Sequence, residues 1–389
     1  MGRQGLLPAA LKSADEDAEH APLRVLVTVT LNENQLRAHL EPLVALDEVG
    51  SVVLVADRSA PEITKLRCVV PPRALVRVAG RAGAKLLLCL LLARRRRPHW
   101  TIGLNLVPHG INAMLAAKAA GGRSLFHMIG GPREILGGGW CSDNTVLGRL
   151  PRPVPALERL LVRLVRACDF VAVMGNGARR LLIQRGMAPD RVIPIPASVD
   201  ERRFRPRAPD GHDYDLVTVS QLIPRKRLDD FVRAVAGLHR TRPRLRAAIV
   251  GRGPVEASLR ALAERLGVAD AIDFLGFRTD VEEVYARSRV FVLTSRSEGL
   301  SIAIAEAMAS GLAVVATDVG EVRDLVRDGE NGHLFGVGDV DALVRLAAGL
   351  LDDPGRCSSL GRRAADDARA VCGRERVRDL YRELLAARP

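Results

Sequence analysis

Two glutamates eight positions apart stand out in SRSEGLSIAIAEAMASG, residues 295–311. Glu298 lies just before a glycine, and Glu306 interrupts a run of small and apolar residues. A carboxylate in such a run needs a hydrogen-bonding partner or a wet cleft, because burying an unpaired charge is costly. A pair of ligand hydroxyls would serve, at about 1.5–3 kcal/mol for each hydrogen bond to a charged group. The alternative is a surface helix with Glu306 in water and Glu298 as an ordinary loop charge.

The start of the same helix offers a second kind of chemistry. Ser301 suits the N-cap position, and the residue three places on is Ile304, so Glu306 is not the glutamate of a capping box. The free N–H groups at Leu300, Ser301 and Ile302 would form a phosphate site at the positive end of the helix. Phosphate at the helix start and hydroxyls beside its second turn match the two ends of a nucleotide.

Two further turns carry nucleotide-like features. Residues 224–227, Pro-Arg-Lys-Arg, connect a predicted strand to a predicted helix, where a phosphate-binding cation belongs in a nucleotide-binding fold. A solvated basic turn is the alternative. Gly251 and Gly253 end another strand, but Glu256 stands where a dinucleotide fingerprint needs its third glycine, so NAD is not indicated.

The elements that position these residues alternate between strand and helix patterns. Apolar runs at 24–30, 51–57, 101–106, 123–130 and 170–175 predict strands, with helical patterns between them. A polar stretch at 198–215 interrupts the alternation, which then restarts. Nearly continuous apolar strands predict parallel sheets covered on both faces. We therefore expect an α/β chain of two tandem doubly wound Rossmann-like domains facing a central cleft. The expected divisions are a flexible tail at 1–22, an N-terminal domain at 23–197, a linker at 198–215 and a C-terminal domain at 216–389. The last helix is a candidate to pack back on the first domain.

Composition narrows the class of protein. The net charge is +13, but aromatic residues make up only 3% of the chain, which is poor for stacking on single-stranded nucleic acid, and no nucleic-acid-binding signature is present. The six cysteines form no Cys-x-x-Cys pair and several lie in apolar runs, a pattern typical of cytoplasmic proteins. The acidic N-terminal stretch does not resemble a secretory signal.

Taken together, residues 216–338 resemble the donor-binding domain of the retaining glycosyltransferases of family 4, the glycosyl transferases group 1, which have the GT-B fold. SQLIPRK (220–226), IVGRGP (249–254), FLGF (274–277) and the Glu-x7-Glu segment at 298–306 occur in the order that the family shows. The front half of the chain resembles the family more loosely.

The resemblance implies roles for individual residues. Glu306 matches the glutamate that holds the ribose hydroxyls, and Glu298 the one at the transferred sugar. Lys226 matches the lysine on the diphosphate, with Arg225 as a second cation, while Gln221 replaces the arginine that the family has in this loop. Backbone contacts with sugar, phosphate and base would come from these residues: Gly299, Leu300, Ser301, Ile302, Gly251, Gly253, Phe277 and Arg278.

The first domain would hold the acceptor. Its first loop, TLNENQL at 30–36, contains Asn32 and Asn34 but none of the glycines usual in the family. His109 and His127 are candidates for the histidine that the family often places at a strand end. Gly130 and Gly131 open a long glycine-rich loop, residues 130–144, which we interpret as an acceptor-side loop.

The predicted activity is metal-independent transfer of a hexosyl group, with retention, from a UDP- or GDP-sugar to a saccharide or lipid-linked acceptor in bacterial polysaccharide or glycolipid synthesis. No cofactor is implied. Asp213 and Asp215 have the spacing of a metal-binding Asp-x-Asp but lie in the linker, so we expect no metal there. The alternatives are a nucleotide-sugar epimerase of the same fold and a non-catalytic basic binding protein.

A basic helix at 73–97 raises the question of a membrane partner. Arg73, Arg77, Arg81 and Lys85 recur every fourth residue, which predicts a basic stripe on one helix face. The apolar run 86–93 is too short to span a bilayer. One interpretation is a crossover helix whose basic face is solvated. The other docks that face on an anionic membrane, so that the enzyme is cytoplasmic and peripheral on the inner face of the cell membrane.

Overall fold

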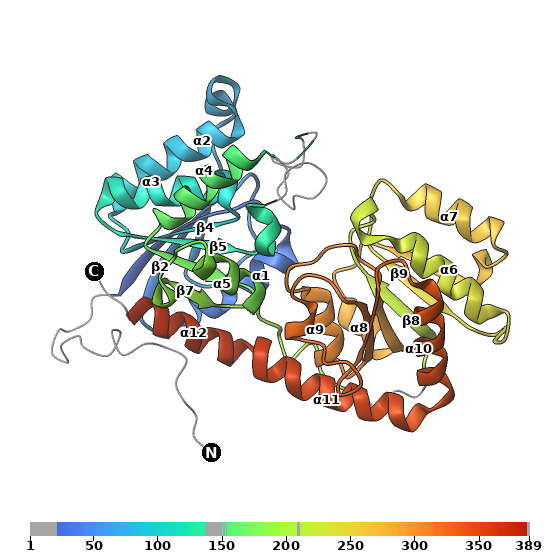
Figure 1. Ribbon diagram of the computed structural model, residues 1–389. Coiled ribbons are helices and arrows are strands. Elements are labelled where there is room, and N and C mark those ends of the chain that lie inside the picture. Colours follow the sequence, from blue (N-terminus) through green and yellow to red (C-terminus); the bar gives the residue numbers. More distant parts are fainter. Residues whose placement is uncertain (1–21, 137–149, 151, 153, 208–210, 387–389) are drawn as a thin grey trace, which may run out of the picture. The chain divides into compact units, whose positions relative to one another are not determined.

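The computed structural model describes residues 22–136, 150, 152, 154–207 and 211–386, and these divide into two compact units. The first comprises residues up to Ser198 together with Val377 onwards, and the second comprises Val199–Arg376. The expected tail at 1–22 lies outside the described residues except for Pro22. Both units are α/β, and Figure 1 shows a sheet with helices on its two faces in each.

The first unit is built on a seven-stranded parallel sheet in the order β3-β2-β1-β4-β5-β6-β7. Its strands are β1 (Leu23–Thr28), β2 (Val49–Val55), β3 (Leu66–Val69), β4 (Trp100–Leu104), β5 (Arg123–Met128), β6 (Phe170–Val173) and β7 (Val192–Pro194). Its helices are α1 (Glu33–Val44), α2 (Arg73–Arg96), α3 (Ile111–Ala120), α4 (Pro155–Arg166) and α5 (Asn176–Gln184), with a π-helical turn η2 (Leu106–Gly110) and a short 3-10 turn η3 (Gly131–Glu134).

Apolar side chains on alternating strand positions build a core on each face of this sheet. Phe126 and Val171 point toward α3, α4 and α5, whereas their neighbours Leu125 and Ala172 point toward α1. The last helix, α12 (Arg374–Ala386), also packs on the α1 face, where Tyr381 and Leu384 are buried. The core of the first unit therefore includes the last turns of the chain.

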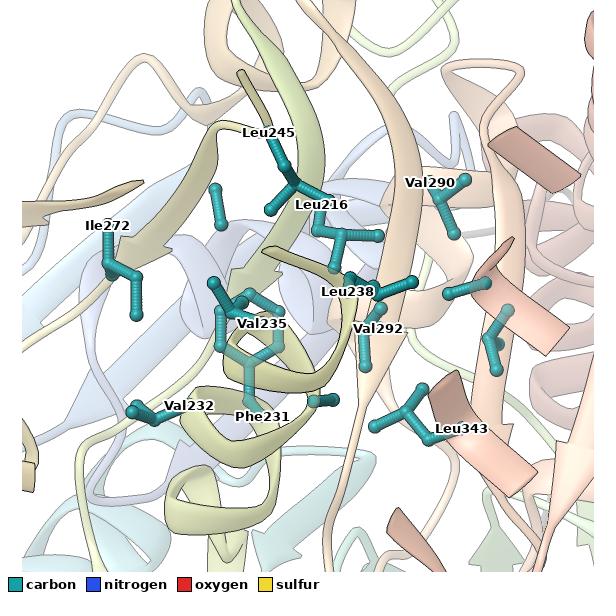
Figure 2. Close-up of a cluster of buried hydrophobic side chains, with 14 of the residues drawn as sticks. Leu216, Phe231, Val232, Val235, Leu238, Leu245, Ile272, Val290, Val292 and Leu343 are labelled. Carbon is teal, nitrogen blue, oxygen red and sulfur yellow. The ribbon is translucent and has the colours of Figure 1, made fainter. Parts of the chain in front are cut away.

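The second unit has a six-stranded parallel sheet in the order β10-β9-β8-β11-β12-β13. Its strands are β8 (Tyr214–Val219), β9 (Ala247–Val250), β10 (Ile272–Gly276), β11 (Ser288–Leu293), β12 (Ala313–Thr317) and β13 (His333–Phe335). Its helices are α6 (Leu228–His239), α7 (Glu256–Arg265), α8 (Val281–Ala286), α9 (Ile302–Ala309), α10 (Val340–Asp352) and α11 (Pro354–Cys372), with a 3-10 turn η7 (Pro224–Lys226). Figure 2 shows the core beneath α6, where Phe231, Val235 and Leu238 meet Leu216 and Val292.

Both sheets have the doubly wound order that the alternation predicted, and the α/β prediction is confirmed. The segment at 198–215 belongs to the second unit from Val199 onwards, and β8 begins inside it at Tyr214. Phe204 is buried there and packs against Tyr285 of α8, with ring centroids 6.1 Å apart. Part of this segment is therefore packed against the second unit through Phe204.

The prediction of a basic stripe along one face of α2 is wrong. Gly80 has φ 67° and ψ 171°, so the helix breaks between Arg77 and Arg81 and the fourfold spacing does not run along one face. Lys85 is buried, at 3% exposure, and pairs with Asp57. Arg73, Arg77 and Arg81 are exposed. Among the described helices, none has the length and apolar content needed to cross a bilayer.

Candidate active site

The sequence-predicted donor residues lie after the carboxyl ends of four adjacent strands in the second unit. Lys226 follows β8, Gly251 follows β9, Phe277 follows β10 and Glu298 follows β11. The strand order reverses between β8 and β11, and ligands of doubly wound sheets bind beyond the carboxyl ends at such a switch point. Topology alone therefore brings these residues to one edge.

Lys226 and Glu298 form a nearly buried ion pair at this edge. Lys226 Nζ lies 2.5 Å from Glu298 Oε1, and the two side chains are only 13% and 7% exposed. Ser295 Oγ donates to the same oxygen. In the described part of the chain no hydrogen bond reaches Glu298 Oε2. The pair thus leaves one carboxylate oxygen and part of the ammonium's donor capacity for a ligand.

Backbone hydrogen bonds connect the two loops that carry this pair. Thr294 Oγ1 donates to Lys226 O at 2.9 Å, and Arg296 N donates to Arg225 O at 2.9 Å. Arg225 Nη1 donates to Ser297 O at 3.0 Å, so the guanidinium, a predicted phosphate contact, is partly engaged in holding the loop. Gln221, in the same loop, is exposed. These hydrogen bonds hold the loops of Lys226 and Glu298 together in the absence of a ligand.

Three glycines allow these loops to pack closely. A Cβ on Gly251 would lie 1.8 Å from Ser220 O, and one on Gly253 would lie 2.2 Å from Leu222 O. Gly320, which sequence reasoning missed, has φ +56°, and its Cβ would lie 1.8 Å from Glu298 O. In this arrangement Gly251 and Gly253 admit the backbone of the Lys226 loop, and Gly320 admits that of the Glu298 loop.

Helix α9 begins as the sequence predicted. Ser301 is its N-cap, and its hydroxyl accepts from Ile304 N at 3.5 Å. No hydrogen-bond acceptor contacts the backbone N–H groups of Leu300 and Ile302 among the described residues. These donors, beside the positive end of the helix and Lys226, are suited to an anion such as a phosphate.

Glu306, in the second turn of α9, is half-buried and receives no hydrogen bond from the described residues. Burial raises the pKa of its carboxyl to about 8; the guanidinium of Arg203 opposes this rise and the Glu282 carboxylate adds to it. Arg203 pairs with Glu282 at 2.7 Å and donates to Thr279 O at 2.8 Å. This carboxyl has acceptor oxygens free for ligand hydroxyls, and hydrogen bonds from those hydroxyls favour its ionised form.

Sequence reasoning did not identify Arg203, because it lies in the polar stretch taken as a linker. Its nearness to Glu306 is a long-range contact that no local pattern carries. Phe277 is 54% exposed, and Arg278 donates to Asp280 at 2.9 Å beside it. These two residues border the same edge after β10, where a base would be expected.

The acceptor-side candidates of the first unit do not all come together. Asn32 caps α1 in a capping box with Gln35, and Asn34 lies in the first turn of that helix. His127 is fully buried, with Nε2 2.9 Å from Ile195 O and Nδ1 3.4 Å from the Tyr381 hydroxyl.

The glycine-rich loop is described only at its start. Gly130 N donates to Glu134 Oε1 at 2.5 Å, and Gly131 has φ +70°. Residues 137–149 of this predicted acceptor loop lie outside the described residues. His109 sits elsewhere, after β4, and is bonded to Thr28 and Thr30.

The two aspartates with metal-like spacing each pair with an arginine. Asp213 contacts Arg287, and Asp215 Oδ1 lies 3.3 Å from Arg289 Nη1. Both lie at the start of β8, at the opposite end of the strand from Lys226. They therefore take no part in the site described above.

Comparison with known proteins agrees with this geometry. Residues 199–367 match the family model described as glycosyl transferases group 1. The chain is 34% identical to the putative glycosyltransferase EpsD of Bacillus subtilis over 47% of this chain and 52% of that protein. It is 29% identical to the N-acetyl-alpha-D-glucosaminyl L-malate synthase of Bacillus anthracis over 71% of each chain.

The fold is shared over nearly the whole chain. HepE of Anabaena, solved in complex with UDP-glucose, superimposes with a TM-score of 0.75 at 18% identity, covering 93% of this chain and 99% of that one. The architecture is thus the GT-B fold of glycosyltransferases. Within the second unit, residues 199–367 are similar to the glycosyl transferases group 1 domain. The match with EpsD spans about half of that relative's length.

Proposed function

We propose that this chain is a retaining glycosyltransferase that moves a hexosyl group from a UDP- or GDP-sugar to a saccharide or lipid-linked acceptor. The observation that carries the proposal is the Lys226–Glu298 pair, 2.5 Å apart, which precedes the open amides at the start of α9, the helix that carries the unbonded carboxyl of Glu306. A cation and free N–H groups suit a diphosphate, and two carboxylates suit sugar hydroxyls. Bacterial polysaccharide or glycolipid synthesis is the setting we propose, in line with the relatives above.

Each residue has a defined part in donor binding. Glu306 accepts hydrogen bonds from the ribose hydroxyls, and the free Oε2 of Glu298 accepts from the transferred sugar. Lys226 has three N–H donors, so it can hold a phosphate oxygen while it keeps Glu298 in place. Phe277 and Arg278 border the position of the nucleotide base.

The reaction needs charge stabilisation more than a side-chain nucleophile. The bond between the anomeric carbon and the diphosphate oxygen breaks, the acceptor oxygen bonds to the same face of that carbon, and the leaving phosphate takes the acceptor's proton. Negative charge grows on the diphosphate as its bond breaks. Lys226 and the amides at Leu300 and Ile302 are preorganised for that charge, and such preorganisation is usually the largest contribution to catalysis.

The test is product analysis with a panel of UDP- and GDP-sugars, using wild type and Glu298→Gln. A glycosyltransferase releases the nucleoside diphosphate and forms a glycoside with retained configuration. An epimerase would change the sugar without an acceptor, and a binding protein would leave every donor intact; either result would refute the proposal. Activity should survive EDTA, whereas strict dependence on added manganese would contradict metal independence and return attention to Asp213 and Asp215.

We further propose that the protein works on the cytoplasmic side of a membrane, through exposed side chains of α2 on both sides of its break at Gly80. Arg73, Arg77 and Arg81 are exposed there, and so are Val78 at 88%, Leu87 at 48% and Leu91 at 45%. Arg94–Arg97 extend the basic surface at the end of the helix. Apolar side chains among arginines suit an anionic lipid surface, where each basic residue contributes about 1 kcal/mol.

A further inference from the structure

Five polar side chains meet at the carboxyl edge of the first unit's sheet. Lys85 Nζ donates to Asp57 Oδ2 at 2.6 Å and to Thr30 Oγ1 at 2.7 Å, and Thr30 Oγ1 donates to the same Asp57 oxygen at 2.5 Å. His109 Nδ1 lies 3.0 Å from Thr28 Oγ1, and its Nε2 lies 3.2 Å from Thr30 Oγ1. Thr28 ends β1 and Thr30 follows it, Asp57 follows β2 and His109 follows β4.

The position of this cluster is that of a ligand site. The strand order reverses between β1 and β4, so the cluster sits at the topological switch point of the first unit. This is the counterpart, in the first sheet, of the edge that carries Lys226 and Glu298 in the second.

Burial in the cluster is one-sided. The side chain of Lys85 is 4% exposed and His109 is buried, but the side chain of Asp57 is 29% exposed and Thr30 is exposed. Asp57 Oδ2 receives both internal donors, while Oδ1 receives none from the described residues. One carboxylate oxygen is therefore held toward the surface by groups behind it.

The hydrogen bonds fix where the protons lie. Burial, together with the Lys85 charge, lowers the pKa of His109 to about 3, so the imidazole is neutral and has one proton. The Thr30 hydroxyl proton goes to Asp57, which only accepts, so Thr30 must accept from His109 Nε2. Nδ1 then accepts from Thr28. Both ring nitrogens are used internally, which makes His109 a support for Thr30 and not a contact for substrate.

A buried ion pair is a weak source of stability. A buried ion pair is often replaceable by apolar residues of similar volume at no loss of stability, because its desolvation cost offsets its attraction. The surrounding helix supplies apolar neighbours such as Cys89 and Ala93 in full burial. What the cluster does provide is a fixed carboxylate oxygen that faces outward at the switch point of the sheet.

We propose that Asp57 binds a hydroxyl group of the glycosyl acceptor, with Lys85, Thr30 and His109 as positioning residues. This inference rests on the proposed function and names the acceptor chemistry of the first unit. Because the outward oxygen carries the negative end of the pair, the group bound there is an uncharged sugar hydroxyl. A phosphate or carboxylate of an acceptor would be repelled at this point and must bind elsewhere.

The test uses the full chain and two probes of uncharged sugar hydroxyls, methyl α-D-glucopyranoside and methyl α-D-mannopyranoside, with saturation-transfer difference NMR. We expect wild type to bind at least one of them saturably and Asp57→Asn to weaken that binding about tenfold or more, as for loss of a hydrogen bond to a charged group. Glu62→Gln, which changes an exposed carboxylate of the same unit, should leave binding unchanged. Glu298→Gln should also retain glycoside binding. A glycoside bound at the donor site would lose its signal in that variant.

A double variant separates binding from structure. Asp57→Asn alone leaves the Lys85 charge without its partner, and Lys85→Met in the same chain removes that charge. If the pair were only structural, the double variant would recover both thermal stability and glycoside binding. We expect stability to recover and binding to stay weak, because the carboxylate oxygen is gone. Recovery of binding, or no saturable binding by wild type, would overturn the inference.

Failure of the proposed function would look different. Calorimetry with the panel of UDP- and GDP-sugars reports the donor site in the second unit, and Asp57→Asn should leave that affinity unchanged. A chain that binds no donor contradicts the proposed function, whereas a chain that binds donor but whose glycoside binding ignores Asp57 contradicts only the present inference.

Discussion

Replacing Glu306 by glutamine should make the second unit more stable at high pH and leave it nearly unchanged at low pH. Burial raises the pKa of this carboxyl from an ordinary 4.5 to about 8, so between these values the folded chain holds a proton that the unfolded chain has lost. Stability from this group is therefore fully present below about pH 4.5 and is lost as the pH rises through about 8. Glutamine does not ionise, so the variant does not lose stability in this way as the pH rises.

The magnitude follows from the same interval. About 3.5 pH units at about 1.4 kcal/mol each set an upper limit of about 5 kcal/mol. Because the side chain keeps some contact with solvent and Arg203 opposes the effect, we expect about 1–3 kcal/mol. The gap between variant and wild type should appear between pH 5 and pH 9.

Urea unfolding of both proteins at pH 5, 7 and 9 measures this gap. Glu264→Gln, an exposed carboxylate of α7, is the matched control and should show no such dependence. A gap between Glu306→Gln and wild type that is constant across this range would refute the reasoning. A bound UDP- or GDP-sugar should shrink the gap, because ribose hydroxyls stabilise the ionised carboxylate, and an unchanged gap would argue against the ribose role.

The remaining predictions concern other parts of the site and the surface. Lys226→Ala should lower kcat more than it raises KM in steady-state kinetics, because its contact strengthens as the phosphate leaves; a rise in KM alone would contradict this. Gly320→Ala should destabilise the chain by about 1–3 kcal/mol in urea unfolding and weaken donor binding, since φ is +56° and a Cβ would lie 1.8 Å from Glu298 O; a neutral result would show that the loop gives way. Changing Arg73, Arg77 and Arg81 to glutamine should reduce cosedimentation with anionic vesicles at low salt, and equal binding by both proteins, or by neither, would remove the membrane proposal.

Much of the donor edge could be predicted because its residues follow recognisable strands. The run VFVLTS predicts β11, and Glu298, Ser301 and the start of α9 follow from it within a few residues. Lys226 is likewise fixed by the end of β8 and the turn after it. In such cases a local pattern, together with the rule that parallel strands end at one edge, is enough to place a side chain.

The features that could not be predicted from the sequence depend on contacts between distant residues or on local exceptions to a pattern. Arg203 approaches Glu306 from a segment whose polarity suggested a linker. Lys85 fits a fourfold basic spacing, and only the break at Gly80 and the partner Asp57, 28 residues away, turn it inward. Strand β3 is four residues long and only part-buried, so it lacks the apolar run that marks a central strand.

Helix α12 has a consequence for how the chain is made. The core of the first unit contains Val377, Leu380, Tyr381, Leu384 and Leu385, which are synthesised after the whole of the second unit. The second unit is continuous from Val199 to Arg376, and all its strands are synthesised before these residues appear. Domains generally fold as units and in order of synthesis. Here we expect the order to be reversed. The second unit completes its core on the ribosome, while apolar surface on the α1 face of the first unit stays uncovered until residues 377–385 emerge. A nascent chain stalled before residue 377 should therefore expose the first unit, and not the second, to chaperones and proteases.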